Sequence, residues 1–150
     1  MYVVIIGCGR LGSFMAREFS NEGHDVAIVD SDRDRLDVLG KGFNGNRILG
    51  IEYDDDVLTE AGIQKADVFF AVCPDDNKNI TASLIAKDFY KVPRVIARIS
   101  SPDKESIYKK LDIEAVNPTT ITKSILKEKI MPGGLKILDW EKLYNKISRG

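Results

Sequence analysis

Short apolar runs alternate along the chain with longer segments in which apolar residues recur at helical spacing. The runs of strand length are Tyr2–Ile6, Asp25–Val29, Arg47–Gly50, Asp67–Val72, Arg94–Arg98 and Glu114–Val116. Val3–Ile6 and Val68–Val72 lack polar alternation, so we expect both faces of these strands to be covered. The pattern predicts an α/β domain with a parallel sheet and right-handed crossovers. Six strands favour a doubly wound sheet with strand order 3-2-1-4-5-6.

The helices between these runs are marked by the residues at which they start and stop. The first is expected from Arg10 to Asn21, before a C-terminal glycine at Gly23. Its predicted apolar stripe consists of Leu11, Phe14, Met15 and Phe19. A later helix begins at Asp75, and its predicted apolar face consists of Ile80, Leu84, Ile85 and Phe89. A last one begins at Asn117-Pro118 and is broken by residues 131–134, which we interpret as a hinge.

Three glycines follow the first apolar run in the segment Gly7-Cys8-Gly9-Arg10-Leu11-Gly12. The segment lies between a predicted strand and a predicted helix, the context in which this spacing indicates a Rossmann-like dinucleotide-binding loop. Gly7 permits the tight turn, Gly9 lets the backbone approach a pyrophosphate, and Gly12 lets the helix pack closely on the strand. An anion there would meet unpaired N–H groups at a helix N-terminus.

An acidic residue, Asp30, ends the second predicted strand, where a carboxylate accepts hydrogen bonds from ribose hydroxyls. Because a carboxylate would repel a 2′-phosphate, NAD(H) or an adenine nucleotide (ATP, ADP or AMP) is favoured over NADP. Asp32 is interpreted as the cap of the next helix. Arg33 and Arg35 either lie near the adenine or, as we prefer, belong to a solvated helix face and pair with Asp34 and Asp37.

The first and fourth strands are neighbours in this order, so Cys8 and the Cys73-Pro74 segment are expected at one cleft. A disulfide between the two cysteines would close that cleft, but small apolar residues at strand ends are the preferred interpretation.

The single histidine, His24, lies in the turn that enters the second strand, at the wrong edge of the sheet for catalysis. The run Asp54-Asp55-Asp56 is interpreted as a helix cap, and no metal site is expected. Tyr53, Lys78 and Tyr108 are isolated and assemble no catalytic site.

Composition narrows the function classes that remain. The 150 residues have a net charge of −1, with 43% hydrophobic and 30% charged residues, as in an ordinary globular domain. The length favours a single nucleotide-binding lobe over a two-lobed enzyme. Neutrality hides an acidic portion, residues 1–90, and a basic portion, residues 91–150. The sequence shows no basic and apolar leader, no run long enough to cross a membrane and no nucleic-acid-binding module, so neither membrane insertion nor nucleic acid is expected.

Several segments together resemble a known family. They are the glycine loop, Asp30, the stretch Leu58-Thr59-Glu60-Ala61-Gly62-Ile63, Ala66-Asp67, Asn79, and the strand Val95-Ile96-Ala97-Arg98-Ile99. Over residues 1–130 the chain resembles the N-terminal nucleotide-binding domain of potassium-transport regulators, the RCK or KTN domain of the Trk/Ktr type. The most specific features are the arginine after the second glycine, the Glu-Ala-Gly-Ile stretch and the Ile-Ala-Arg strand.

The resemblance implies a regulator and not an enzyme. Such domains form homodimers, and in some cases higher rings, on the cytoplasmic face of a membrane potassium channel or transporter, and they change shape on binding NAD(H) or ATP/ADP. By position, Gly7 to Gly12 would hold phosphates with added charge from Arg10, and Asp30 would hold the ribose. Arg98 would reach the phosphates or the nicotinamide side, although a salt bridge at a strand end is the alternative.

One position departs from the family pattern. The family has Gly-Asp at the end of the third strand, where the acidic residue approaches the adenosine, but this chain has Gly50-Ile51-Glu52-Tyr53. Ile51 therefore occupies the acidic position. Glu52 either substitutes from the next position or points away, since side chains alternate along an extended segment.

Residues 131–150 form the predicted hinge and a short amphipathic segment. Its apolar stripe consists of Leu135, Leu138, Leu143 and Ile147. We expect the stripe to pack on a second subunit, ahead of its own core or a membrane surface. Two other classes stay open for the whole chain: an NAD-dependent oxidoreductase lobe that works with a separate substrate subunit, and a redox-sensing transcriptional regulator.

Overall fold

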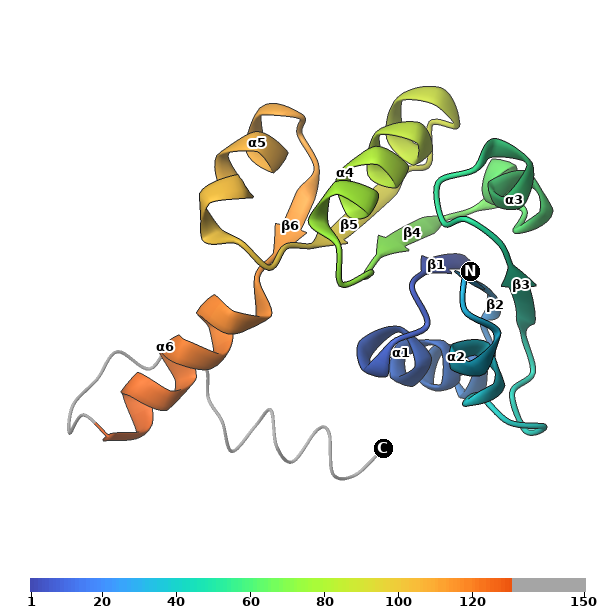
Figure 1. Ribbon diagram of the computed structural model, residues 1–150, viewed down its shortest axis with the longest axis horizontal. Coiled ribbons are helices and arrows are strands. Elements are labelled where there is room, and N and C mark those ends of the chain that lie inside the picture. Colours follow the sequence, from blue (N-terminus) through green and yellow to red (C-terminus); the bar gives the residue numbers. More distant parts are fainter. Residues whose placement is uncertain (131–150) are drawn as a thin grey trace. The chain divides into compact units, whose positions relative to one another are not determined.

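The computed structural model describes residues 1–130, which fall into two compact units, Met1–Asn117 and a second that begins at Pro118. The first unit is built on a six-stranded parallel sheet with the order β3-β2-β1-β4-β5-β6 (Figure 1). Its strands are β1 (Tyr2–Ile6), β2 (Asp25–Asp30), β3 (Asn46–Leu49), β4 (Val68–Ala71), β5 (Arg94–Arg98) and β6 (Glu114–Val116). The predicted doubly wound, Rossmann-like fold is therefore confirmed, with strand ends within two residues of the expected ones.

Helices connect consecutive strands on both faces of the sheet. They are α1 (Arg10–Asn21), α2 (Arg33–Asp37), α3 (Asp55–Glu60), α4 (Asp76–Leu84) and α5 (Glu105–Lys110), with short helical turns η1 (Ile63–Lys65), η2 (Ile85–Phe89) and η3 (Pro102–Lys104). Two core clusters separate the layers. One contains side chains of α1 and α2, and the other contains side chains of α3, α4, η2 and α5. Along β1, Val3 and Ile5 belong to the first cluster and Val4 and Ile6 to the second, as expected for a strand covered on both faces.

The apolar stripe predicted for α1 is wrong in part. Leu11 and Phe14 are 41% and 67% exposed, and the buried positions are the small residues Gly12, Ser13 and Ala16. A Cβ atom on Gly12 would lie 1.9 Å from the carbonyl oxygen of Gly7. The helix therefore runs so close to the end of β1 that only small side chains fit beneath its first turns.

The helix that begins with Asp75 as its cap also differs from its prediction. Asp75 accepts a hydrogen bond from the Asn77 N–H, and α4 continues at Ile85 into the π-helical turn η2. A π turn inserts one extra residue and rotates the next residues about the helix axis. Phe89, expected on the apolar face, is consequently 72% exposed.

The second unit contributes helix α6 (Pro118–Ile130), which begins at the expected proline. Its apolar residues Ile121, Leu126 and Ile130 are exposed. The hinge and amphipathic segment predicted for residues 131–150 lie outside the described residues. Within the part that is described, no helix is both long enough and apolar enough to cross a bilayer.

The close contact between Gly12 and Gly7 predicts that alanine at Gly12 destabilises the domain much more than alanine at Gly9, in the same loop. Gly12→Ala should lower the free energy of unfolding by about 2–4 kcal/mol, because the new methyl group meets a backbone oxygen that cannot move aside. Gly9→Ala should change it by less than about 0.5 kcal/mol, because nothing lies within 4 Å of a Cβ at that position. Urea denaturation of both variants measures the difference, and equal losses would contradict this packing.

Candidate functional site

The glycine loop lies at the carboxyl edge of the sheet, where the strand order reverses. β1 pairs with β2 on one side and β4 on the other, and ligands of doubly wound sheets bind in the crevice outside this point. Gly9 is the N-cap of α1 and provides no side-chain hydrogen bond to the first turn. The N–H groups that begin α1 are thus open to an anion. Arg10 and Leu11 are exposed at the rim.

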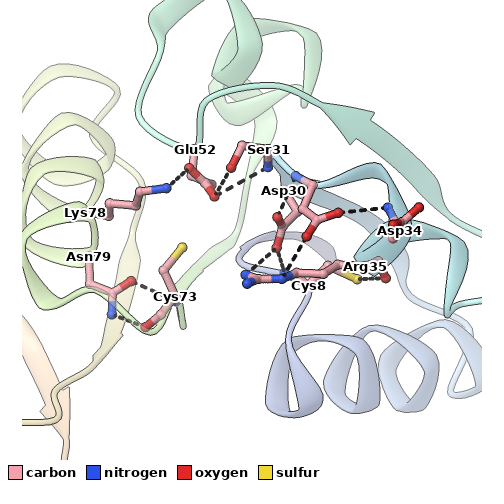
Figure 2. Close-up of polar contacts among 10 residues, drawn as sticks. Cys8, Asp30, Ser31, Asp34, Arg35, Glu52, Cys73, Lys78 and Asn79 are labelled. Carbon is pink, nitrogen blue, oxygen red and sulfur yellow. Dashed lines mark hydrogen bonds and ion pairs between the residues drawn. The ribbon is translucent and has the colours of Figure 1, made fainter.

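Asp30 is buried at the end of β2 and is attached to the glycine loop. Its carboxylate accepts a hydrogen bond from the backbone N–H of Cys8 at 2.6 Å (Figure 2). It also accepts one from the backbone N–H of Asp32 at 2.9 Å. A guanidinium nitrogen of Arg35 lies 3.8 Å from the same carboxylate. The sequence thus places Asp30 correctly beside the loop.

Arg35 corrects a prediction about the neighbouring helix. It pairs with Asp30 and, at 3.4 Å, with Asp32, and not with Asp34 or Asp37. Asp32 caps α2 as predicted, by accepting from the Asp34 N–H. The cap brings the Asp32 carboxylate to the helix start, where a residue three positions later lies on the same side.

Glu52 points into the site, while Ile51 is 49% exposed. The Glu52 side chain is 3% exposed and accepts hydrogen bonds from the Ser31 hydroxyl at 3.0 Å and the Lys78 ammonium group at 2.8 Å (Figure 2). The backbone N–H of Ser31 also donates to it, at 3.4 Å. Of the two open alternatives for Glu52, the structure shows the inward one. Ile51, a candidate contact in the sequence, is thus the more exposed of the two residues.

The charge state of Glu52 depends on Lys78. Burial raises the pKa of Glu52, but hydrogen bonds from Lys78, its own backbone and Ser31 outweigh burial and leave the pKa below its usual value. The same hydrogen bond raises the pKa of Lys78. Both groups are therefore charged at neutral pH. The sequence analysis treated Lys78 as isolated. Its place in the first turn of α4, the helix that follows β4 at the carboxyl edge, could have indicated that it lies near Glu52.

The Asn79 side chain connects the ends of β4 and β5 by hydrogen bonds. Its side-chain oxygen accepts from the Cys73 N–H at 2.9 Å, and its amide nitrogen donates to the carbonyl oxygens of Cys73 at 2.9 Å and Arg98 at 3.0 Å. Arg98 is half-buried at the same edge, and its buried Nε has no hydrogen-bond partner among the described residues. This unsatisfied donor is buried, so it is not itself open to solvent at the carboxyl edge.

The two cysteines lie at the carboxyl edge, on opposite faces of the sheet. Cys8 belongs to the core cluster under α1 and α2, and its thiol donates to the Arg35 carbonyl oxygen at 3.1 Å. Cys73 belongs to the other cluster, and Pro74, which comes next, is exposed. Burial, reinforced by nearby carboxylates, raises the pKa of Cys8 to about 11 and that of Cys73 to about 12. Protonated thiols on opposite faces favour small apolar residues over a disulfide switch.

The remaining candidates lie where the sequence predicts. His24 is in the turn before β2, at the amino edge, 3.9 Å from Glu22. Asp54 caps α3 by accepting from the Asp56 and Val57 N–H groups. Within residues 1–130, no group of three or more acidic, histidine or cysteine side chains is placed to hold a metal ion. Two surface cavities also lie at the amino edge, away from the glycine loop.

Removal of the Asn79 amide should destabilise the fold. Asn79→Ala leaves the Cys73 N–H and C=O and the Arg98 C=O without this partner, so we expect a loss of about 3 kcal/mol in unfolding free energy. Asn77→Ala, an exposed asparagine on the same helix, is the matched control and should cost less than about 0.5 kcal/mol. Equal losses in urea denaturation would show that Asn79 does not carry this connection.

The lowered pKa of Glu52 predicts an acid-dependent stability. Its ionised form stabilises the folded state above the unfolded pKa of about 4.3, and this contribution is lost as the pH falls through the lower folded value. Below about pH 4.3 the unfolding free energy should therefore fall more steeply in the wild type than in Glu52→Gln. Parallel pH profiles of the two proteins would contradict the assigned charge state.

The amino-acid sequence matches a known domain family and curated relatives. Residues 3–118 match the family model for the TrkA-N domain. The chain is 39% identical over 138 residues to the Trk system potassium uptake protein TrkA of Streptomyces coelicolor, which covers 92% of this chain and 62% of that protein. The chain thus spans less than two thirds of the length of this relative.

Solved structures share the fold at low sequence identity. The AMP-bound C-terminal domain of Kef from Shewanella denitrificans superposes with a TM-score of 0.78 at 18% identity, over 99% of this chain and 93% of that one. The GsuK channel bound to NAD superposes with a TM-score of 0.73 at 18% identity, over 83% of this chain and 23% of that one. With the family model matching most of the chain, the resemblance seen in the sequence is confirmed, and the protein belongs to the TrkA-N domain family.

Proposed function

We propose that this chain is a nucleotide-sensing regulatory unit of a potassium transport system and not an enzyme. The observation that carries the proposal is the start of α1, a helix N-terminus without a side-chain cap that faces the point where the strand order reverses. The ligand is NAD(H) or an adenine nucleotide. The names of the relative and of the ligand-bound neighbours, which carry AMP and NAD, support both parts of the proposal.

The residues at the edge fit such a ligand. The open space beside Gly9 leaves room for phosphates against the loop, and Gly7 to Gly12 would hold them, with charge from Arg10. Asp30 would accept from ribose hydroxyls, since a carboxylate that already accepts two N–H groups has further lone pairs. Arg98, half-buried at the end of β5, would reach the phosphates or the nicotinamide side with its guanidinium group.

The first turn of α4 offers a route from the ligand to the rest of the domain. Asp76, 6% exposed, accepts from the Ser100 and Ser101 N–H groups at 2.8 and 3.2 Å, which ties the segment after β5 to α4. Asn79 ties down the ends of β4 and β5. A ligand that displaces this turn would therefore also move the segment that leads into α5 and β6.

The output in this proposal is a change of shape delivered to a partner. The chain would act as a homodimer or a higher ring, at the cytoplasmic face of the cell membrane, on a membrane-embedded potassium channel or transporter subunit. The relative's name, a potassium uptake protein, and the GsuK channel neighbour support this partner class.

Isothermal calorimetry with NADH, NAD, ATP, ADP and AMP tests the proposal. We expect saturable binding of at least one of them, and no binding at millimolar concentration would overturn the proposal.

Gly9→Val should weaken nucleotide binding by about tenfold or more, because its side chain takes the space that the phosphates need. Gly42→Val, also open on its Cβ side but far from the loop in sequence, is the control and should bind normally. Substrate-dependent NADH oxidation would favour the oxidoreductase alternative instead.

A further inference from the structure

Four charged side chains at the carboxyl edge form two pairs, each with a buried carboxylate. Asp30 and Glu52 have side chains only 1% and 3% exposed, while their partners Arg35 and Lys78 are 46% and 33% exposed. Both cations are thus engaged by carboxylates that are not free to turn towards solvent. The crevice carries no excess positive charge from these four groups.

The Glu52–Lys78 pair connects segments that follow strands on either side of the glycine loop. One carboxylate oxygen of Glu52 binds Ser31, in the segment between β2 and α2, and the other binds Lys78, on α4 (Figure 2). These elements follow β2 and β4, the strands that flank β1 and its glycine loop. A ligand that lies along the carboxyl edge must therefore pass next to this pair.

The pair is also close to the glycine loop. Asn79, the residue after Lys78, makes hydrogen bonds of 2.9 Å to the backbone N–H and C=O of Cys73. The Cys73 backbone nitrogen in turn lies 2.8 Å from the position that a Cβ on Gly7 would occupy. The turn of α4 that carries Lys78 therefore lies beside the glycine loop.

The pairing of Lys78 with Glu52 bears on how strongly the edge would attract different phosphate chains. A terminal triphosphate carries more negative charge than the pyrophosphate that bridges the two halves of a dinucleotide. While Lys78 is bound to Glu52, the extra negative charge of a triphosphate is attracted only weakly by the Lys78 ammonium group and is repelled by the buried Glu52 carboxylate.

We propose that the Glu52–Lys78 pair is a specificity determinant that makes the crevice prefer a dinucleotide over a nucleoside triphosphate. The inference rests on the nucleotide binding proposed above. It assigns Lys78 a role that depends on its partner. Bound to Glu52, Lys78 balances a buried charge; released from Glu52, it would bind phosphate.

Calorimetry with NADH and with ATP, in magnesium-free buffer of fixed ionic strength, tests this role. The wild type should bind NADH more tightly than ATP. Glu52→Gln keeps an oxygen for Ser31 but removes the charge, so affinity for ATP should rise about five- to tenfold, with NADH affinity changed less than about twofold. The double variant Glu52→Gln/Lys78→Met should lose that gain.

Two further variants separate this role from a general charge effect. Lys78→Met alone leaves Glu52 uncompensated and should weaken ATP binding more than NADH binding. Asp112→Asn is the matched control, since Asp112 binds Lys87 at the same distance of 2.8 Å in the segment just before β6, at the amino edge. It removes the same charge and should leave the ratio of the two affinities unchanged.

The outcomes distinguish the inference from the function on which it rests. If the wild type binds neither ligand nor any other adenine nucleotide, both fall. If it binds nucleotide but the ratio of NADH to ATP affinity stays constant in Glu52→Gln and in Lys78→Met, only the inference falls. A gain in ATP affinity that persists in the double variant, or that Asp112→Asn reproduces, would also overturn it.

Discussion

The close approach of α1 to the end of β1 determines where the helix N-terminus lies and which residues of α1 are buried. A Cβ on Gly12 would meet the Gly7 carbonyl oxygen at 1.9 Å, and a Cβ on Gly7 would meet the Cys73 backbone nitrogen at 2.8 Å. Only glycine permits contacts this close, and the result is a helix N-terminus at the very edge of the sheet, against the end of β4. The same contact explains why α1 buries small residues and leaves Leu11 and Phe14 exposed.

Around this contact, three polar side chains of α4 connect segments that are far apart in sequence. Asp76 binds the segment after β5, Lys78 binds the segment after β3, and Asn79 binds the ends of β4 and β5. Each of these segments meets the carboxyl edge. The edge is therefore held by side-chain hydrogen bonds in addition to the sheet, and such bonds can rearrange without breaking the strand pairing.

The sequence predicted the strand order, the glycine loop and the place of Asp30, because each depends on local pattern or on a rule of topology. It did not predict the Glu52–Lys78 pair, since 26 residues separate its members and Glu52 comes after β3, where alternation allows either direction. Phe89 was misplaced because a π turn has no signature in hydrophobic periodicity. Arg35 was misassigned because one partner, Asp30, reaches it only through the fold, and the other, Asp32, is brought to the start of α2 by its cap.

The buried carboxylates are the least expected feature of a site for an anionic ligand. Repulsion between a carboxylate and a phosphate would weaken binding, yet two of them lie at the same edge of the sheet as the open helix N-terminus. Each is held by donors of the domain itself: backbone N–H groups for Asp30, and Ser31 with Lys78 for Glu52. In the proposed function, a carboxylate fixed in this way would bind hydroxyl or amino groups of a nucleoside and at the same time limit the charge of its phosphate chain. Selectivity for a nucleotide would then result from the balance between the helix N-terminus, which attracts negative charge, and the carboxylates, which repel it.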